Sequence, residues 1–157
     1  MKSFKLFLYF LLFAFLISLI LSNESEMKEE ERANVVVLNQ HNFNTAINNN
    51  TYVFVKFYSP YCALSKKLEP EYIKAAQSLH KAGNPITLAE VESTANQNLI
   101  QKYKIDGYPT LKLFIVGIPH EYNGGRTESE LVSWINKNTG FASKELKTVK
   151  EVTLNLL

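Results

Sequence analysis

Cysteine is almost absent from this sequence, which contains a single one, Cys62, among its 157 residues. One thiol cannot form an internal disulfide, so the fold is not stapled by cysteine bridges. The same thiol is available for a bond to another molecule. The three histidines, His41, His80 and His120, are scattered along the chain. Because no second cysteine joins them, a structural zinc cluster is excluded, and we expect neither a metal nor a cofactor.

The sequence also has little net charge of either sign. Its 17 basic and 15 acidic residues leave a formal charge of +2 at neutral pH. A strongly basic surface is what draws a protein to nucleic acid phosphates, so we expect no nucleic acid partner. The length allows one domain with terminal extensions.

The first 22 residues have the layout of a secretory signal peptide. A short positive segment is followed by an unbroken apolar run from Leu6 to Leu21 and then by small polar residues. The run is shorter than the ~20 residues that a membrane-spanning helix needs. We therefore expect residues 1–22 to be a signal peptide cleaved after Ser22. A membrane anchor is the alternative if this segment is not cleaved, because Ile20-Leu21 makes an imperfect cleavage site.

One α/β domain is predicted over residues 34–140. A charged linker, residues 23–33, precedes it, and a C-terminal tail, residues 141–157, follows. Short β-branched and aromatic runs indicate strands, and apolar residues at three- and four-residue spacing indicate helices. The expected strands are 35–38, 52–58, 86–91, 111–116 and 120–122, with helices following the first, second, third and last of them. This alternation implies a central mixed β-sheet with helices on both faces.

Cys62 lies where a strand pattern gives way to a helix pattern. Ser59-Pro60 interrupts the strand, so we expect Cys62 in the first turn of the helix. Unpaired N–H groups and the helix dipole favour a thiolate at that position. A small buried cysteine without chemistry is the alternative. The strand–proline–aromatic–cysteine–helix context favours a reactive thiol.

Three motifs carry a resemblance to a known family. The segment 57–72 reads FYSPYCALSKKLEPEY and resembles the F-Y-A-P-W-C-G-H-C-K-x-L-x-P-E-Y pattern of catalytic domains of the protein disulfide isomerase family. Residues 107–110, GYPT, are similar to the family's cis-proline loop, and residues 122–127 to its Y-x-G-x-R segment. The resemblance covers about residues 34–140. It implies a thioredoxin fold, thiol–disulfide exchange on protein clients during folding, and residence in the endoplasmic reticulum lumen or secretion.

The second cysteine of the family's C-x-x-C motif is Ser65 here. Without a resolving thiol, Cys62 cannot cycle between dithiol and disulfide by itself. The resemblance therefore implies isomerisation, not net oxidation or reduction, with Cys62 as the nucleophile and Ser65 as a hydrogen-bond donor. The usual Gly-His pair is Ala63-Leu64, which removes a potential cation beside the sulfur. We expect a Cys62 pKa below the reference value of about 8.5 and above that of a C-G-H-C relative.

Two further positions are expected to modulate the site. One of them differs from the family's usual residue, and the other matches it but has no second thiol to act on. Lys56 stands where the family usually places a buried glutamate, the proton acceptor for the second cysteine. A buried ammonium is unfavourable unless it is paired, so Lys56 is expected to reach the surface or a carboxylate such as Glu90. An ordinary strand lysine is the alternative. Arg126 matches an arginine that tunes the second thiol in relatives; with Ser65 present, a plain surface arginine is favoured.

The resemblance also implies a site for clients. Pro109 is expected to be cis and to lie against the Cys62 sulfur, leaving the Tyr108 backbone open to an extended client chain. Tyr61 and Leu64 add apolar contacts for unfolded segments. The expected partners are unfolded or disulfide-containing proteins, with glutathione as a further thiol partner.

Other functions remain open for the same residues. Cys62 could retain clients in long-lived mixed disulfides without turnover, as a thiol-dependent chaperone. It could link two copies of the chain into a dimer. The domain could also be a folded remnant without activity.

Overall fold

The computed structural model describes residues 12–18 and 32–141. Residues 12–18 are helical and belong to a unit of their own, separate from the unit that begins at Asn34. The expected signal-peptide cleavage, most of the linker and the C-terminal tail lie outside the described residues. Within the described ranges, the helices are all too short or too polar to span a lipid bilayer.

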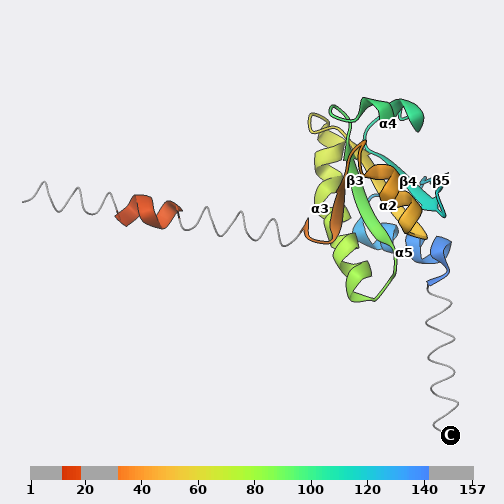
Figure 1. The fold of residues 1–157 in the computed structure, drawn as a ribbon. Helices are drawn as coiled ribbons and strands as arrows, with labels where there is room; N and C mark the ends of the chain where they lie inside the picture. Colours follow the sequence, from red (N-terminus) through yellow and green to blue (C-terminus); the bar gives the residue numbers. More distant parts are fainter. Residues whose placement is uncertain (1–11, 19–31, 142–157) are drawn as a thin grey trace, which may run out of the picture. The chain divides into compact units, whose positions relative to one another are not determined.

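A five-stranded mixed sheet forms the centre of the domain (Figure 1), with the strand order β1-β3-β2-β4-β5. Its strands are β1 (Val35–Leu38), β2 (Tyr52–Tyr58), β3 (Thr87–Glu92), β4 (Thr110–Ile115) and β5 (Ile118–Glu121). β2 pairs in parallel with β3 and antiparallel with β4. Residues 53–57 are fully buried because β2 has neighbours on both sides and helices on both faces. A central strand of this kind is mostly apolar, and Lys56 is the charged exception in β2.

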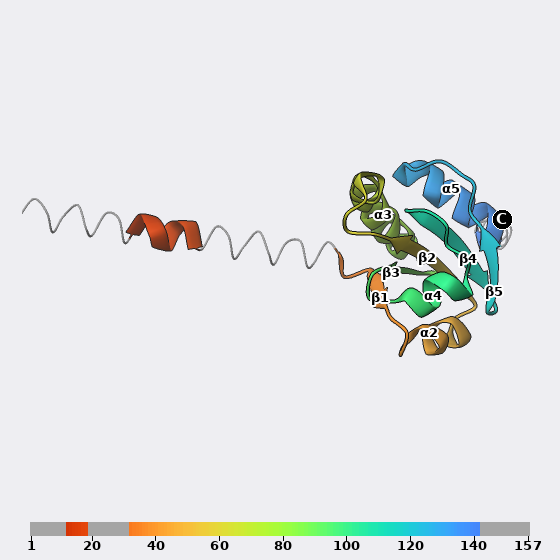
Figure 2. The same ribbon diagram turned by 90° about the horizontal axis from the view of Figure 1, so that it is seen from above.

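Two helices cover each face of the sheet (Figure 2). They are α3 (Ala63–Lys81) and α5 (Glu128–Thr139) on one face, and α2 (Phe43–Asn49) and α4 (Gln97–Lys102) on the other. Because side chains alternate along a strand, β2 contributes to two cores. Phe54 packs in the core with α3 and α5, and Phe57 packs in the core with α2 and α4. The predicted mixed sheet with helices on both faces is confirmed.

The last strand begins earlier than the sequence predicted. β5 covers Ile118–Glu121, not residues 120–122. Val116 and Gly117 have φ values of 47° and 82°, so the chain reverses in a tight turn and pairs with β4 at once. Pro119 is tolerated in this strand because β5 is the edge of the sheet.

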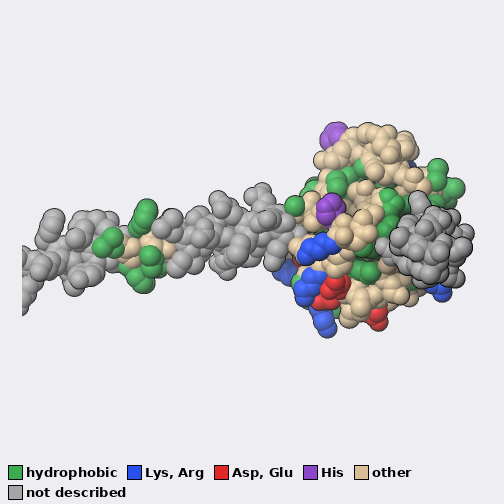
Figure 3. Space-filling model, turned by 90° about the horizontal axis from the view of Figure 1, so that it is seen from below, with side chains coloured by type: hydrophobic (Ala, Val, Ile, Leu, Met, Phe, Trp, Pro, Cys, Tyr) green, Lys and Arg blue, Asp and Glu red, His purple; other side chains and the backbone are tan. Residues whose placement is uncertain are grey.

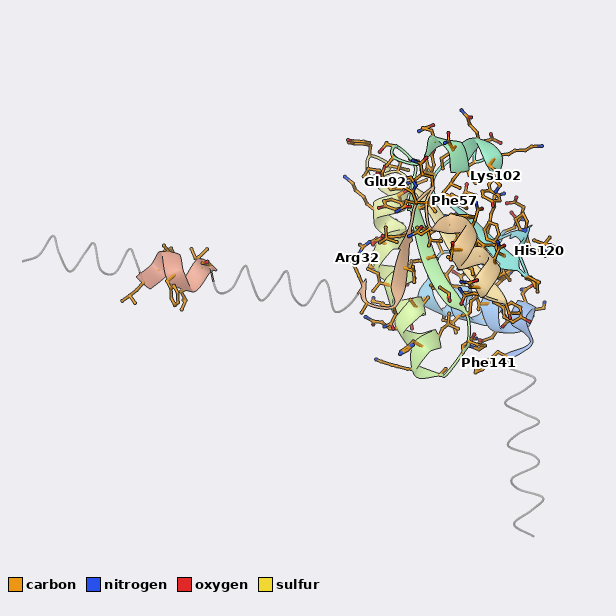
Figure 4. The ribbon with its side chains drawn as sticks, in the orientation of Figure 1. Arg32, Phe57, Glu92, Lys102, His120 and Phe141 are labelled. Carbon is orange, nitrogen blue, oxygen red and sulfur yellow. The ribbon has the colours of Figure 1, made fainter. Side chains whose placement is uncertain are left out.

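The parallel pairing of β2 and β3 brings their carboxyl ends to the same end of the domain, where Tyr58 pairs with Glu92. Figure 4 shows Phe57 and Glu92 there, whereas His120 lies on the edge strand. The segment that carries Cys62 follows β2 directly and is placed at this end. On the face drawn in Figure 3, basic and acidic side chains lie close together without forming a continuous basic surface.

Candidate functional site: a thiol at a helix N-terminus beside a cis-proline

Cys62 is the N-cap residue of α3, and the helix itself begins at Ala63. The expectation that Cys62 belongs to the first turn is therefore wrong by one residue. The reason is local: the Cys62 N–H donates to the Ser59 carbonyl over 3.1 Å, which closes a turn and keeps Cys62 extended, with ψ at 120°. Its carbonyl already accepts the Lys66 N–H at 3.1 Å. The Cys62 side chain therefore lies at the start of the helix, next to the first-turn N–H groups that have no acceptor within the helix.

Hydrogen bonding at this helix end lowers the pKa of Cys62 from its ordinary value. The largest cause is the Ser65 backbone N–H, burial opposes it, and the Ser65 hydroxyl and the Leu64 backbone N–H add smaller lowering effects. Each donor stabilises the thiolate over the thiol. The predicted direction of the shift is confirmed, while the comparison with a C-G-H-C relative stays a prediction.

Ser65 is buried, with 3% of its surface exposed, and lies one helical turn after Cys62. The Ser59 N–H donates to the Ser65 hydroxyl oxygen over 3.5 Å. The hydroxyl thus lies between the turn and the helix. It supplies a donor to the sulfur, but it carries no thiol that could attack a mixed disulfide.

The Tyr108–Pro109 peptide bond is cis, as predicted. The Cys62 thiol donates to the Tyr108 carbonyl over 3.3 Å, which joins two segments that are 46 residues apart. Arg126 donates from its guanidinium to the Pro109 carbonyl over 3.2 Å. The proline loop is therefore held between Cys62 and Arg126, and whether Arg126 has any effect on the thiol stays a prediction.

Two large apolar side chains stand in solvent beside the sulfur. Tyr61 is 85% exposed and Leu64 is 65% exposed, and Cys62 between them is half-buried. Tyr108 is half-buried and packs against the core below α2 and α4. The structure therefore brings the expected client-binding residues together around a thiol that solvent can reach.

A cleft of about 740 Å³ opens beside the proline loop, and sequence reasoning did not foresee it. One wall is a face of α3, and the other walls are the proline loop and the segment before α5. The lining residues are Leu64, Lys67, Leu68, Glu71, Tyr108, Pro109, Arg126 and Thr127. The three- and four-residue spacing of the α3 members marks them as one helical face, but the pattern does not tell which loops close over it.

The thioredoxin family model matches residues 34–137 of this chain. The chain belongs to the thioredoxin family. Protein disulfide-isomerase of Drosophila melanogaster is 44% identical over 130 residues, which are 83% of this chain and 26% of the relative. Human protein disulfide-isomerase A4 is 43% identical over 117 residues, covering 74% of this chain and 18% of the relative. The chain thus spans about a quarter or less of these curated relatives.

Solved structures agree with the family. A crystal structure of human ERp44 has a TM-score of 0.63 and 30% identity, over 66% of this chain and 29% of that one. The first thioredoxin domain of mouse protein disulfide-isomerase A4 has a TM-score of 0.60 and 35% identity, over 64% of this chain and 72% of that domain. The predicted thioredoxin fold and the thioredoxin-like domain of the protein disulfide isomerase family are confirmed.

This thioredoxin domain holds a buried lysine in the middle of its sheet. Lys56 is fully buried, and its Nζ lies 2.8 Å from Glu90 Oε2 and forms a second ion pair with Glu69. The ammonium also lies 4.8 Å from the ring centroid of Tyr72 and 5.0 Å from that of Tyr58. The predicted carboxylate partner is confirmed, and the alternative that Lys56 reaches the surface is wrong. Elsewhere in the described parts, no three acidic, histidine or cysteine side chains form a metal-binding cluster.

Proposed function

We propose that Cys62 exchanges disulfides with protein clients as a single-thiol isomerase. The observation that carries the proposal is the placement of the Cys62 sulfur: at the N-terminus of α3, with a lowered pKa, half-buried, and 3.3 Å from the carbonyl before Pro109. A lowered pKa raises the thiolate fraction near neutral pH, and the thiolate is the nucleophile. The relatives named protein disulfide-isomerase support the same chemistry.

The exchange needs no external oxidant or reductant. The Cys62 thiolate attacks one sulfur of a client disulfide, the Cys62–client bond forms, and the other client sulfur leaves as a thiolate that takes a proton from solvent. A different client thiolate then attacks the mixed disulfide, forms a new client disulfide and releases Cys62. The number of disulfides is unchanged, so the product is an isomer. Ser65 cannot perform the release, because its hydroxyl forms no sulfur–sulfur bond.

The remaining site residues are assigned to binding and support. Tyr61 and Leu64 provide exposed apolar surface for unfolded segments. Tyr108 and Pro109 present the backbone against which an extended client lies, and Arg126 supports that loop. Lys56 acts only through the fold, as the ammonium that neutralises two carboxylates beneath α3.

The proposed location is the lumen of the endoplasmic reticulum, or the cell exterior. An apolar segment preceded by positive residues supports a signal peptide at residues 1–22, with an anchor as the alternative. Residues 23–33 are the proposed linker, residues 34–140 the thioredoxin domain and residues 141–157 a tail. An oxidising compartment supplies the disulfide-containing clients that the exchange requires.

Refolding of scrambled ribonuclease in a glutathione buffer tests the proposal. We expect reactivation by the wild-type protein and none by Cys62→Ser. Client adducts that persist on Cys62 without reactivation would instead identify a retention chaperone, which the lack of a resolving thiol also favours. Alkylation of Cys62 no faster than that of free cysteine, with no adducts, would identify a remnant. Non-reducing electrophoresis of the purified protein shows whether Cys62 links two copies.

A further inference from the structure

A short triplet between α2 and β2 has no part in the thiol chemistry. Residues 49–51 read Asn-Asn-Thr, which is the Asn-x-Thr acceptor sequence for N-linked oligosaccharides. Such a triplet is used on the surface of a protein that enters the secretory pathway. A role for it therefore rests on the location proposed above, that of an exported protein, and on how the fold presents the triplet.

Both ends of the triplet are exposed. Asn49 is the last residue of α2, and Thr51 stands in the bend before β2. Within residues 32–141, neither side chain makes a hydrogen bond or an ion pair. The amide of Asn49 and the hydroxyl of Thr51 are the two groups that the acceptor sequence requires. Both are therefore open to another molecule.

The middle residue of the triplet fixes this arrangement. Asn50 is extended, with φ at −123° and ψ at 136°. Its side-chain amide donates to the Ala46 carbonyl over 2.8 Å, and its amide oxygen accepts the Thr87 hydroxyl at 3.3 Å. Side chains on either side of an extended residue point opposite to its own. Because Asn50 points inward to α2 and β3, Asn49 and Thr51 point outward.

The triplet lies at the end of the domain opposite to Cys62. Thr51 precedes β2 and Cys62 follows it, and the seven residues of this strand span roughly 20 Å. A bulky group on Asn49 therefore leaves Cys62 and the proline loop open to clients.

An apolar turn lies next to the triplet. The Val116 N–H donates to the Thr51 carbonyl over 2.8 Å, so the turn between β4 and β5 packs against the triplet. Val116 is 72% exposed and Ile118 is 62% exposed. Exposed aliphatic side chains at the edge of a sheet favour association between chains. This turn is the surface that a group on Asn49 can cover.

We propose that Asn49 is the acceptor of an N-linked oligosaccharide and that this oligosaccharide covers the apolar turn at Val116 and Ile118. The donor is an oligosaccharide joined through diphosphate to a membrane lipid, and a transferase of the lumen catalyses the step. The Asn49 amide nitrogen attacks the anomeric carbon of the first N-acetylglucosamine. A carbon–nitrogen bond forms, and the carbon–oxygen bond to the diphosphate breaks. The lipid diphosphate leaves, and the amide nitrogen loses one proton to solvent.

Translation of the full chain in the presence of microsomes tests the acceptor. The sequence holds a second acceptor triplet, Asn23-Glu24-Ser25, outside the described residues, so every chain in the experiment carries Ser25→Ala. On this background we expect one endoglycosidase-sensitive shift in mobility, and none after Asn49→Gln or Thr51→Ala. Two controls should keep the shift: Thr51→Ser, which retains the hydroxyl, and Asn48→Gln, which changes an exposed asparagine outside the triplet.

Digestion by added protease locates the chain in the same reaction. A chain that is protected inside the microsomes but lacks the shift would overturn Asn49 as the acceptor and leave the proposed location standing. A chain that the protease digests would overturn the location and the modification together. Thiol exchange by Cys62 is tested separately, by the refolding of scrambled ribonuclease.

Removal of the oligosaccharide tests whether it covers the turn. The protein is purified from a eukaryotic host and treated with an endoglycosidase that leaves one N-acetylglucosamine, and its association is followed by light scattering. We expect association to become several-fold faster after the treatment. The double variant Val116→Ser with Ile118→Ser should abolish this difference. A difference that persists in the double variant, or no difference in the wild type, would overturn the covering of the turn.

Discussion

The Nζ of Lys56 lies 2.8 Å from Glu90 Oε2, and the two residues face each other in register across β2 and β3. Lys56 is fully buried and Glu90 is 1% exposed. Neither charge can turn to water, so each depends on the other, and Lys56 has a second carboxylate partner in Glu69. We therefore expect substitutions at this buried ion pair to lower the stability of the domain strongly.

Removal of the ammonium is therefore expected to destabilise the domain. Lys56→Met leaves Glu90 buried and without its cation, and we expect a loss of about 3–5 kcal/mol in the free energy of unfolding. Urea denaturation followed by circular dichroism measures it. The double variant Lys56→Met with Glu90→Gln should recover most of the loss, because it removes the buried carboxylate together with its cation.

Lys112→Met is the control for that experiment. Lys112 is also buried and ion-paired, but its partner Glu121 is 60% exposed and stays hydrated when the lysine is removed. We expect a loss of about 1 kcal/mol or less. A loss for Lys56→Met as small as that for Lys112→Met would contradict the view that the Glu90 charge depends on Lys56.

The pH dependence of Cys62 reactivity is a second expected result. Because hydrogen bonds to the thiolate lower the pKa of Cys62, alkylation by iodoacetamide should reach half its maximal rate at a lower pH than for free cysteine. Ser65→Ala removes the hydroxyl donor but keeps the backbone N–H, which is the larger cause. The midpoint should then move toward the ordinary value without reaching it. A midpoint unchanged in Ser65→Ala would show that the hydroxyl does not reach the thiolate.

Client binding gives a third prediction, based on the exposed apolar side chains beside the sulfur. Leu64→Ser is expected to lower isomerase activity on an unfolded protein several-fold by raising KM, because it removes apolar surface that a client covers. Val37→Ser is the matched control: Val37 is 61% exposed on the edge strand β1, away from the site. Its activity should equal that of the wild type. Equal losses in both variants would point to a general effect of surface polarity.

The order of the elements was predictable because it follows from local patterns. Strand and helix periodicities gave the alternation, and the apolar run of β2 marked it as central. Glu90 was predictable as the partner of Lys56 because both stand in strands, and pairing follows from strand order. The second partner, Glu69, was not predictable, because it belongs to α3. Which strand residue a helix residue contacts depends on packing between distant segments and not on a local pattern.

The cleft was unpredictable for the same reason. Its α3 wall is a helical face, but Arg126 and Thr127 arrive from the segment before α5, and no local pattern places that segment against α3. The contact between Cys62 and Tyr108 could be predicted only through the resemblance to a known family. The position of Cys62 at the N-cap was missed because the turn that begins at Ser59 sets where the helix starts.

The last prediction concerns the missing thiol. Ser65→Cys restores a C-x-x-C pair on the same helical face, and we expect it to gain insulin reductase activity that the wild type lacks. The gain should be small, because position 65 is 3% exposed and burial raises the pKa of a thiol there. Lys56 also stands where a carboxylate would accept the proton of that thiol. Turnover should therefore rise steeply with pH, and the double variant Cys62→Ala with Ser65→Cys should be inactive. If Ser65→Cys gains nothing at any pH, the scaffold has lost more than the second sulfur.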